Sequence, residues 1–362
     1  MLALELKEIF MRLVRVGSPP GFEEPMMQAL KSELEPYVDE VHVTSRGNVV
    51  GVQRGTGDGA PSVALVAHTD QVGFVVSNVE ERGFIRFRRM GGAVTRAIQG
   101  QHLRLLTEKG PVPGVVGIKP GHITTPEEAR TVPPIDEMYI DIGAWSREEA
   151  EAMGVKIGTP VVSDAGPVEL ANNLIASPAV DDRGGLTALV GVARELKGAQ
   201  IPATVYYIGS VEEEIGLRGA SVALFNLDVD MAVAIDTFPA GYQPDVNMRD
   251  LVYEVGKGPA IHIGEGGAGN IRAVHHHRVR EWLLGAAEAE GIPYQSAFMH
   301  GGTDARAMAQ TRSGVPAATI GLPRRYSHSP VEVFALRDLE NLVKILVTAV
   351  KRLDKGFSLR RA

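Results

Sequence analysis

Residues of types that bind metal ions recur along the chain, each beside a strand-like or helix-starting run of apolar residues. They are His68, Asp181, the acidic triplet Glu212–Glu214, Asp236 and His328. Imidazole and carboxylate donors suit zinc, and a catalytic zinc site keeps one position open for water. Two such ions can stabilise both the attacking and the leaving group of a hydrolysis. These residue types therefore predict a two-metal hydrolase, with a peptidase as the favoured kind.

His68 and Asp70 form an H-x-D motif at the end of the apolar run 62–68. Residues two apart in a strand face the same way, so Asp70 can approach the His68 ring and orient it. Taken alone, the motif fits equally well an aspartate that caps a helix beside a surface histidine. Asp181-Asp182 precedes a helical pattern, and taken alone this pair favours a simple helix cap.

The triplet Glu212–Glu214 directly follows the strand-like run 203–210. Adjacent residues of an extended chain point in opposite directions, so one glutamate can bind metal while its neighbour acts as a general base. A surface acidic run is the alternative, but such a run seldom abuts a buried strand. Asp236 ends the apolar run 231–236, where a carboxylate needs water, a partner or a metal. His328 lies in a polar loop, where a histidine is often only solvated.

Composition narrows the class of protein. The chain has 362 residues, a net charge of -7 and no cysteine. Metal ligands must therefore be His or carboxylate, which favours zinc, cobalt or manganese over thiolate chemistry. The lack of a long basic block argues against a nucleic-acid or anionic-membrane partner. The N-terminus has the pattern of an amphipathic helix and not of a signal peptide, and no apolar run approaches the ~20 residues of a membrane span, so we expect a cytoplasmic location.

The elements that must position these residues follow from the hydrophobic pattern. Near-continuous apolar runs, typical of strands buried on both faces, cover 62–68, 203–210, 231–236 and 315–321. Helical periodicity covers 24–38, 185–198, 276–291 and 336–356. This alternation predicts an α/β fold with a central, largely parallel sheet flanked by helices. Ligands of such folds gather at the C-terminal ends of the strands, which is where His68 and Asp236 are expected.

The stretch 72–162 has a different pattern. Short strand-like pieces alternate with Gly or Pro turns there, and long helical periodicity is largely missing. We expect a small all-β domain, a barrel or a sandwich, inserted into a catalytic domain made of residues 1–71 and 163–362.

The order of the motifs resembles the tetrahedral (TET) aminopeptidases, a family of di-metal metallopeptidases that includes glutamyl aminopeptidases and has some members labelled endoglucanase. Six motifs appear in the family's order over nearly the whole chain: H-x-D, D-D-R, E-E-x-G-L-R-G-A, a strand-end Asp, G-G-T-D-A and R-Y-x-H-S. The resemblance implies a zinc-peptidase-like fold with a mixed sheet, and hydrolysis of N-terminal residues from peptides with a free N-terminus. It also implies a cytoplasmic homo-dodecamer built from dimers, in which the insertion 72–162 makes the dimer contacts.

The resemblance also implies residue roles. Two divalent ions per subunit, zinc first and cobalt or manganese as alternatives, would be held by His68 and Asp236, by Glu214 and His328, and by Asp181 between them. Glu213 would be the general base acting on a metal-bridged water, and Asp70 would support His68. The chain departs from the family at Gln71, where relatives commonly have Glu.

Three alternatives use some of the same residues. A metal-dependent deacylase or a carboxypeptidase would use the same site, and would need a cationic clamp such as Arg324 or Arg325. A glycoside hydrolase needs two carboxyl groups about 5–10 Å apart across the sugar bond, which the neighbours Glu213 and Glu214 supply poorly. A non-enzymatic scaffold would leave every competent ligand position unexplained.

Overall fold

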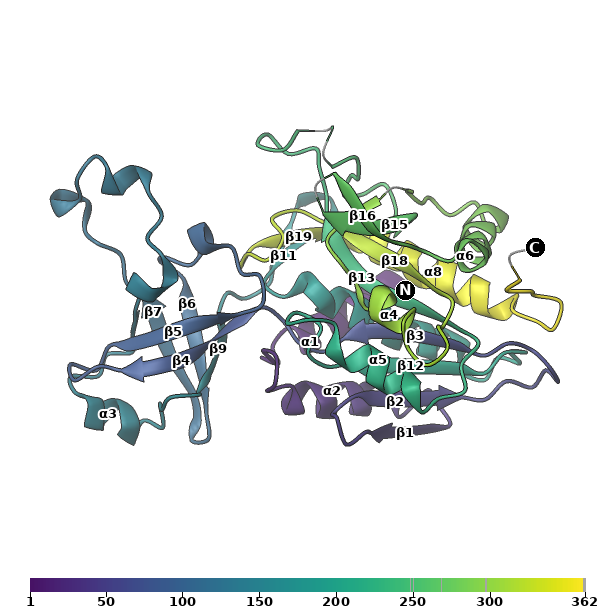
Figure 1. Cartoon of the computed structure of the whole chain (residues 1–362), viewed down its shortest axis with the longest axis horizontal. Helices are drawn as coiled ribbons and strands as arrows, with labels where there is room; N and C mark the ends of the chain where they lie inside the picture. Colours follow the sequence, from purple (N-terminus) through teal and green to yellow (C-terminus); the bar gives the residue numbers. More distant parts are fainter. Residues whose placement is uncertain (248, 250, 268, 297, 361–362) are drawn as a thin grey trace.

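The computed structural model describes residues 1–360 except 248, 250, 268 and 297. It consists of a large α/β body and a smaller β-barrel that projects from one end of it (Figure 1). None of the helices in these described residues combines the length and the apolar character that crossing a membrane requires.

A seven-stranded mixed sheet forms the centre of the body, in the order β1-β2-β12-β3-β13-β18-β14. Its middle strands run parallel: β12 (Val205–Ser210), β3 (Val63–His68), β13 (Met231–Pro239) and β18 (Ala317–Arg324). The outer strands pair antiparallel: β1 (Glu40–Val43), β2 (Val49–Gln53) and β14 (Ala260–Ile261). The predicted α/β fold with a mixed, largely parallel sheet is confirmed.

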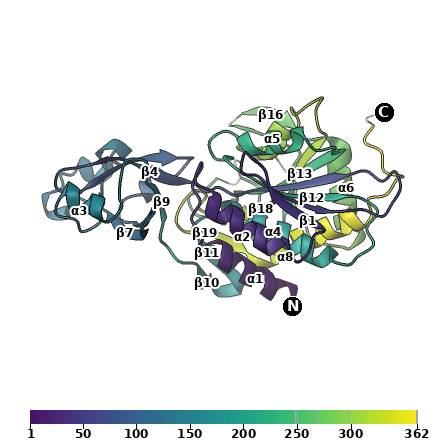
Figure 2. The ribbon, with the colours of Figure 1, turned by 90° about the horizontal axis from the view of Figure 1, so that it is seen from below.

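Helices cover both faces of this sheet, because successive side chains of a strand point to opposite faces. Leu65 and Val233 face a core formed with α1 (Leu2–Leu13), α2 (Glu24–Leu34), α4 (Val180–Leu196), α6 (His277–Ala289) and α8 (Leu336–Lys351). Val66 and Ala234 face the other core, formed with α5 (Arg218–Phe225) and α7 (Asp304–Met308). Figure 2 shows α1 and α8 on one side of the sheet and α5 on the other. Burial on both faces explains why the strands are continuously apolar in sequence.

The position of Asp236 differs from the prediction. Asp236 does not end its strand, because β18 pairs with β13 as far as Pro239 opposite Arg324. The pairing of β13 with β3, in contrast, stops at Ala234 opposite Val66. Asp236 therefore lies inside its own strand, β13, but beyond the last residue of β3 that pairs with β13. Its side chain thus lies near the C-terminal end of β3.

The barrel is closed and has the strand order β4-β5-β8-β7-β6-β9. Its strands are β4 (Gly73–Val79), β5 (Ile85–Met90), β6 (His102–Thr107), β7 (Gly110–Val116), β8 (Ile140–Asp141) and β9 (Pro160–Ser163), with α3 (Arg147–Ala152) outside them. The barrel has its own apolar core, which includes Phe74, Phe87 and Leu103. Because the first strand pairs with the last, the chain enters and leaves the barrel at neighbouring positions.

Two small sheets border the C-terminal edge of the large sheet. One contains β10 (Val168–Leu170), β11 (Leu174–Ser177) and β19 (Glu332–Ala335), and the other β16 (Asn270–Val274), β15 (Gly264–Gly267) and β17 (Phe298–His300). The strand β11 leads directly into α4, so the first sheet fixes the point where that helix begins.

Candidate metal centre

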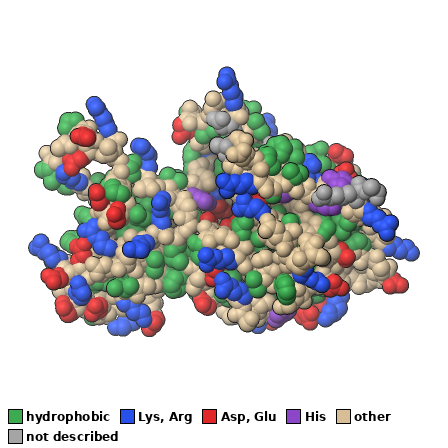
Figure 3. All heavy atoms as spheres, in the orientation of Figure 1, with side chains coloured by type: hydrophobic (Ala, Val, Ile, Leu, Met, Phe, Trp, Pro, Cys, Tyr) green, Lys and Arg blue, Asp and Glu red, His purple; other side chains and the backbone are tan. Residues whose placement is uncertain are grey.

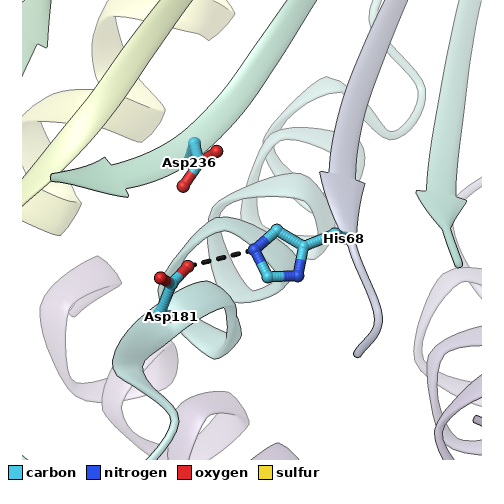
Figure 4. A group of neighbouring side chains, drawn as sticks. All are labelled: His68, Asp181 and Asp236. Atoms are coloured by element: carbon cyan, nitrogen blue, oxygen red, sulfur yellow. Dashed lines mark hydrogen bonds and ion pairs between the residues drawn. The ribbon is translucent and has the colours of Figure 1, made fainter. Parts of the chain in front are cut away.

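The five predicted ligands meet in two groups that share Asp181. One group is His68, Asp181 and Asp236, and the other is Asp181, Glu214 and His328; the potential ligand atoms within each group lie within 4.8 Å of one another. His68 Nε2 is 3.0 Å from Asp181 Oδ1, and His328 Nε2 is 3.2 Å from Asp181 Oδ2. The two oxygens of Asp181 thus face different histidines, as a carboxylate shared by two ions requires. Figure 4 shows the first group.

Each ligand comes from a different element at the C-terminal edge of the parallel strands. His68 is the last residue of β3, Glu214 follows β12, and Asp236 lies in β13. Asp181 is in the first turn of α4, and His328 lies in the loop between β18 and β19. This edge is where open α/β sheets bind ligands, because the loops that follow neighbouring parallel strands converge there.

The start of α4 is fixed by Asp182. Its carboxylate accepts hydrogen bonds from the N–H of Gly185 at 2.8 Å and from the N–H of His68 at 3.3 Å. A Cβ on Gly185 would lie 2.2 Å from Asp182 Oδ2, so only glycine fits against this cap. Asp182 therefore caps the helix and ties it to β3, while its neighbour Asp181 faces the other ligands.

The acidic side chains of the centre are buried close together. Burial, and next the charge of Asp181, raise the pKa of Glu214 to about 7. Burial and the charge of Asp181 also raise the pKa of Asp236 well above its usual range. Glu214 Oε1 is buried and has no hydrogen-bond partner within the described part of the chain. Such a cluster is costly without cations, and its nitrogen and oxygen donors fit two divalent ions of the zinc type.

Asp70 connects His68 with the loop that carries the glutamates. The N–H of Glu213 donates to Asp70 Oδ1 and the N–H of Glu214 donates to Asp70 Oδ2, both at 3.0 Å. His68 Nδ1 lies 3.1 Å from the main-chain oxygen of Asp70 and 3.5 Å from its Oδ1. Asp70 thus contacts the His68 ring, as expected, and also holds the next two predicted functional residues, which the sequence did not indicate.

Two further residues hold the same loop. Asn48 Oδ1 accepts from the N–H of Val211, and Glu23 Oε1 accepts from the N–H of Glu212, both at 3.1 Å. Together with Asp70, these side chains bind four successive N–H groups, those of residues 211–214. The Glu212 side chain pairs with Arg46 at 2.7 Å, which leaves the other two glutamates for the centre. No local pattern marks Asn48 or Glu23, because these contacts join segments far apart in the sequence.

Gln71 lies next to the centre, but within the described residues its side chain forms no hydrogen bond with any of the five ligands. Its Oε1 accepts from Arg183 Nη2 at 2.8 Å and from the N–H of Ser18 at 3.4 Å. Arg183 is fully buried and also donates to the main-chain oxygen of Thr69 at 3.0 Å. The side chain of Gln71 therefore holds a structural arginine beneath the H-x-D segment.

A cavity of about 290 Å³ opens over the centre. Four of the ligands, all except His68, line it together with Glu213, and Leu217, Met299 and Arg306 also line it. Figure 3 shows that the molecule is hollowed between the barrel and the body, where acidic and histidine side chains are visible. The cavity gives a small part of a substrate access to four of the ligands and to Glu213 at once.

Comparison with known proteins agrees with this geometry. Residues 47–345 match the family model described as M42 glutamyl aminopeptidase. The chain is 34% identical to a lysyl aminopeptidase of Pyrococcus furiosus, over 96% of this chain and 97% of the relative. Aminopeptidase APDkam598 from the archaeon Desulfurococcus kamchatkensis has a similar structure, with a TM-score of 0.93 and 34% identity over 99% of this chain and 97% of that chain.

A second solved structure extends the comparison to an assembly. This structure is the TET1 peptidase of Pyrococcus horikoshii, which can assemble into a tetrahedron or a large octahedral shell. It matches with a TM-score of 0.84 and 29% identity, over 96% of this chain and 100% of that chain. The resemblance found in the order of the motifs is therefore confirmed along almost the entire length of the chain. The protein belongs to the M42 glutamyl aminopeptidase family of peptidases.

Proposed function

We propose that the protein is a two-metal aminopeptidase that removes the first residue from peptides with a free N-terminus. The observation that carries this proposal is the division of five donors into two groups joined by the two oxygens of Asp181. His68 and Asp236 would hold one divalent ion, Glu214 and His328 the other, and Asp181 both. Zinc is the first candidate, and the same donors accept cobalt or manganese.

The pair of ions, when bound, supplies Lewis-acid stabilisation of the developing oxyanion and lowers the pKa of water. Glu213 lines the cavity and is the one acidic residue of the loop 211–214 that neither belongs to a donor group nor pairs with Arg46. Its carboxylate would take a proton from the attacking water and then donate that proton to the leaving amine. Asp70 would hold Glu213 and Glu214 in place through their N–H groups.

The carboxypeptidase alternative needs a cationic side chain that is free to bind a carboxylate. Arg324 lines the cavity, but it already pairs with Asp181 and with Glu332. Arg325 is not among the residues that line the cavity. Neither of these two arginines is thus a free clamp, and the similarity to aminopeptidases over nearly the whole chain favours the aminopeptidase.

A substrate panel tests this proposal. Aminoacyl-p-nitroanilides and their N-acetylated counterparts would be assayed after chelation and after return of Zn²⁺, Co²⁺ or Mn²⁺. We expect metal-restored cleavage of the free-amine substrates alone. Release of acetate, without nitroaniline, from the acetylated substrates would support a deacylase instead, and absence of cleavage with every metal would contradict the proposed activity.

Glu213→Gln tests the role of the base. The amide keeps the size of the side chain and cannot take a proton, so we expect kcat to fall by about 10²–10⁴-fold. Metal content, measured by elemental analysis, should stay at the wild-type level because Glu213 is not in either donor group. Unchanged turnover would rule out Glu213 as the general base.

For the assembly, we propose a cytoplasmic homo-dodecamer in which the barrel, within the predicted insertion 72–162, contributes dimer contacts. The match to a peptidase that forms a tetrahedron supports a large closed assembly. Several apolar side chains on the barrel are exposed in the single chain, including Ile118, Ile123 and Trp145 at 59%, 65% and 87% exposure, and such side chains are suited to a contact between subunits.

A further inference from the structure

Glu332, the first residue of β19, is a buried carboxylate that joins two of the ligand segments. Its Oε2 accepts from the N–H of Asp181 at 3.1 Å, and its Oε1 accepts from the N–H of His328 at 2.7 Å. The same Oε1 accepts from Arg324 Nε at 3.0 Å. The side chain of Glu332 is only 1% exposed. It therefore fixes the main chain of two members of the group Asp181–Glu214–His328. In the other group it contacts only Asp181, which both groups share.

Arg324, the last residue of β18, carries this connection to a ligand oxygen. Its Nη2 donates to Asp181 Oδ2, the same oxygen that faces His328 Nε2. Asp181 Oδ1 faces His68 instead of Arg324. The guanidinium is 2% exposed and lines the cavity, and its Nη1 has no hydrogen-bond partner in the described portion of the chain. Arg324 thus hydrogen-bonds to the oxygen of the shared ligand that faces His328, and not to the oxygen that faces His68.

The charges of this pair have opposite effects on an ion at that group. A buried guanidinium beside a ligand oxygen repels a dication and competes for the lone pairs of that oxygen. The carboxylate of Glu332 attracts the dication and partly neutralises the guanidinium. Partners of metal ligands change metal affinity by about 10–100-fold when they are removed. Among the described residues, no arginine forms an ion pair with Asp236, and Arg324 reaches the other group only through the shared Asp181.

We propose that Arg324 and Glu332 are positioning residues that set the affinity of the Asp181–Glu214–His328 group below that of the His68–Asp181–Asp236 group, so that the centre fills in two steps. The proposal rests on the proposed two-metal function. Arg324 and Glu332 would thereby determine how many ions the protein binds at a given metal concentration.

Titration of the chelated, intact protein with Zn²⁺, followed by calorimetry and by elemental analysis, tests the inference without an activity assay. The wild-type protein should bind two ions in two resolved steps. Glu332→Gln removes the negative charge and should weaken the second step by about 10–100-fold. Arg324→Met removes the positive charge and should strengthen the same step by about tenfold. The first step should change little in both variants.

Opposite signs for the two partners of one ion pair are the critical result, because loss of packing alone would weaken binding in both variants. The double variant Arg324→Met/Glu332→Gln restores the net charge, so the affinity of its second binding step should be close to that of the wild type. Arg324→Lys keeps the charge and should also resemble the wild type. Glu33→Gln is the matched control, since it breaks the Arg12–Glu33 pair away from the centre.

Three results would overturn the inference. Weakening of the second step by both single variants would reduce the pair to a packing role. Two wild-type ions bound in one step of equal affinity would show that the groups are not unequal. A wild-type protein that binds fewer than two ions would contradict the two-metal function itself, and the inference with it. Thermal unfolding of each variant shows whether a change in binding accompanies a loss of fold.

Discussion

Asp70 has two hydrogen-bonding tasks that a neutral side chain cannot perform together. Both of its oxygens accept from main-chain N–H groups, those of Glu213 and Glu214. In Asp70→Asn an NH₂ group must face one of these donors, which leaves a buried N–H without an acceptor. We expect kcat/KM to fall by about 10–100-fold, in the range found for other partners of metal ligands.

The control for Asp70 is an aspartate with a similar bond outside the centre. Asp39 Oδ2 accepts from the N–H of Arg54 at 2.7 Å in an exposed position. Asp39→Asn should leave kcat/KM for a p-nitroanilide substrate unchanged. Equal losses in Asp70→Asn and Asp39→Asn would mean that Asp70 has no special part in the reaction.

We expect Arg306 to recognise the first side chain of a substrate. It lines the cavity, is 30% exposed, and lies 3.6 Å from Glu265, so Glu265 only partly neutralises its charge. A Cβ on Gly302 would lie 2.3 Å from Arg306 Nη2, so the glycine makes room for the guanidinium. We expect a preference for an acidic first residue over an uncharged one of the same size.

The preference is measured as the ratio of kcat/KM for glutamyl- and glutaminyl-p-nitroanilide. Arg306→Gln should lower this ratio by about tenfold, because a charge-assisted hydrogen bond is lost. Arg312→Gln, which removes an arginine that pairs with Asp228 at 3.8 Å, serves as the control. A ratio that is the same in all three proteins would exclude Arg306 from specificity.

At the scale of elements, α4 depends on close packing, because it begins at the metal centre and packs against one face of the large sheet. Gly191 lies in this helix, and a Cβ there would be 2.6 Å from Leu6 Cδ2 and 3.1 Å from Val343 Cγ2. Gly191→Ala should therefore lower the free energy of unfolding by about 1–3 kcal/mol through overpacking. Chemical denaturation followed by circular dichroism measures this change.

Gly285 in α6 gives the opposite expectation, which makes it the matched control. A Cβ there would meet no atom within 4 Å. Alanine is the better helix former, so Gly285→Ala should raise the free energy of unfolding by roughly 0.5–1 kcal/mol. Equal effects of the two substitutions would mean that contacts of α4 with α1 and α8 do not limit its sequence.

The sequence predicts elements best where a pattern is long and local. The helices α4 and α8 and the strands β3 and β12 were found because each repeats its apolar pattern over several residues. The position of Asp236 was predicted incorrectly, since the length of β13 depends on its pairing with β18. Short strands such as β15 and β17 carry too few residues for a period to be recognised.

In the candidate site, too, some residues were predicted from local patterns and others were not. His68, Glu214 and their fellow ligands were found because their types are unusual beside apolar runs and because the motifs resemble a family. Glu23 and Glu332 were not found as partners of the ligand segments, since their hydrogen bonds join residues 189 and 151 positions apart. Such contacts exist only once the chain is folded, and no local pattern records them.

At the scale of the whole molecule, the closed barrel is a separable unit whose removal tests its part in assembly. Its first and last strands pair, with Phe74 opposite Val161, so a short linker can join the body after residues 72–162 are deleted. We expect the shortened chain to form small soluble species, because the proposed dimer contacts are lost. Light scattering of both proteins gives the masses, and an intact large assembly after deletion would refute the role of the barrel.

The division of the donors into two groups has a consequence for synthesis of the chain. The first group is complete once Asp236 has been made, but the second needs His328, whose partner Glu332 follows shortly after it. A growing chain that already carries Glu213 thus still lacks one of the proposed ion sites until the last helix is about to begin. On the proposed two-metal mechanism, unfinished copies would therefore lack peptidase activity, and other nascent chains nearby, which also present free N-termini, would not be exposed to it.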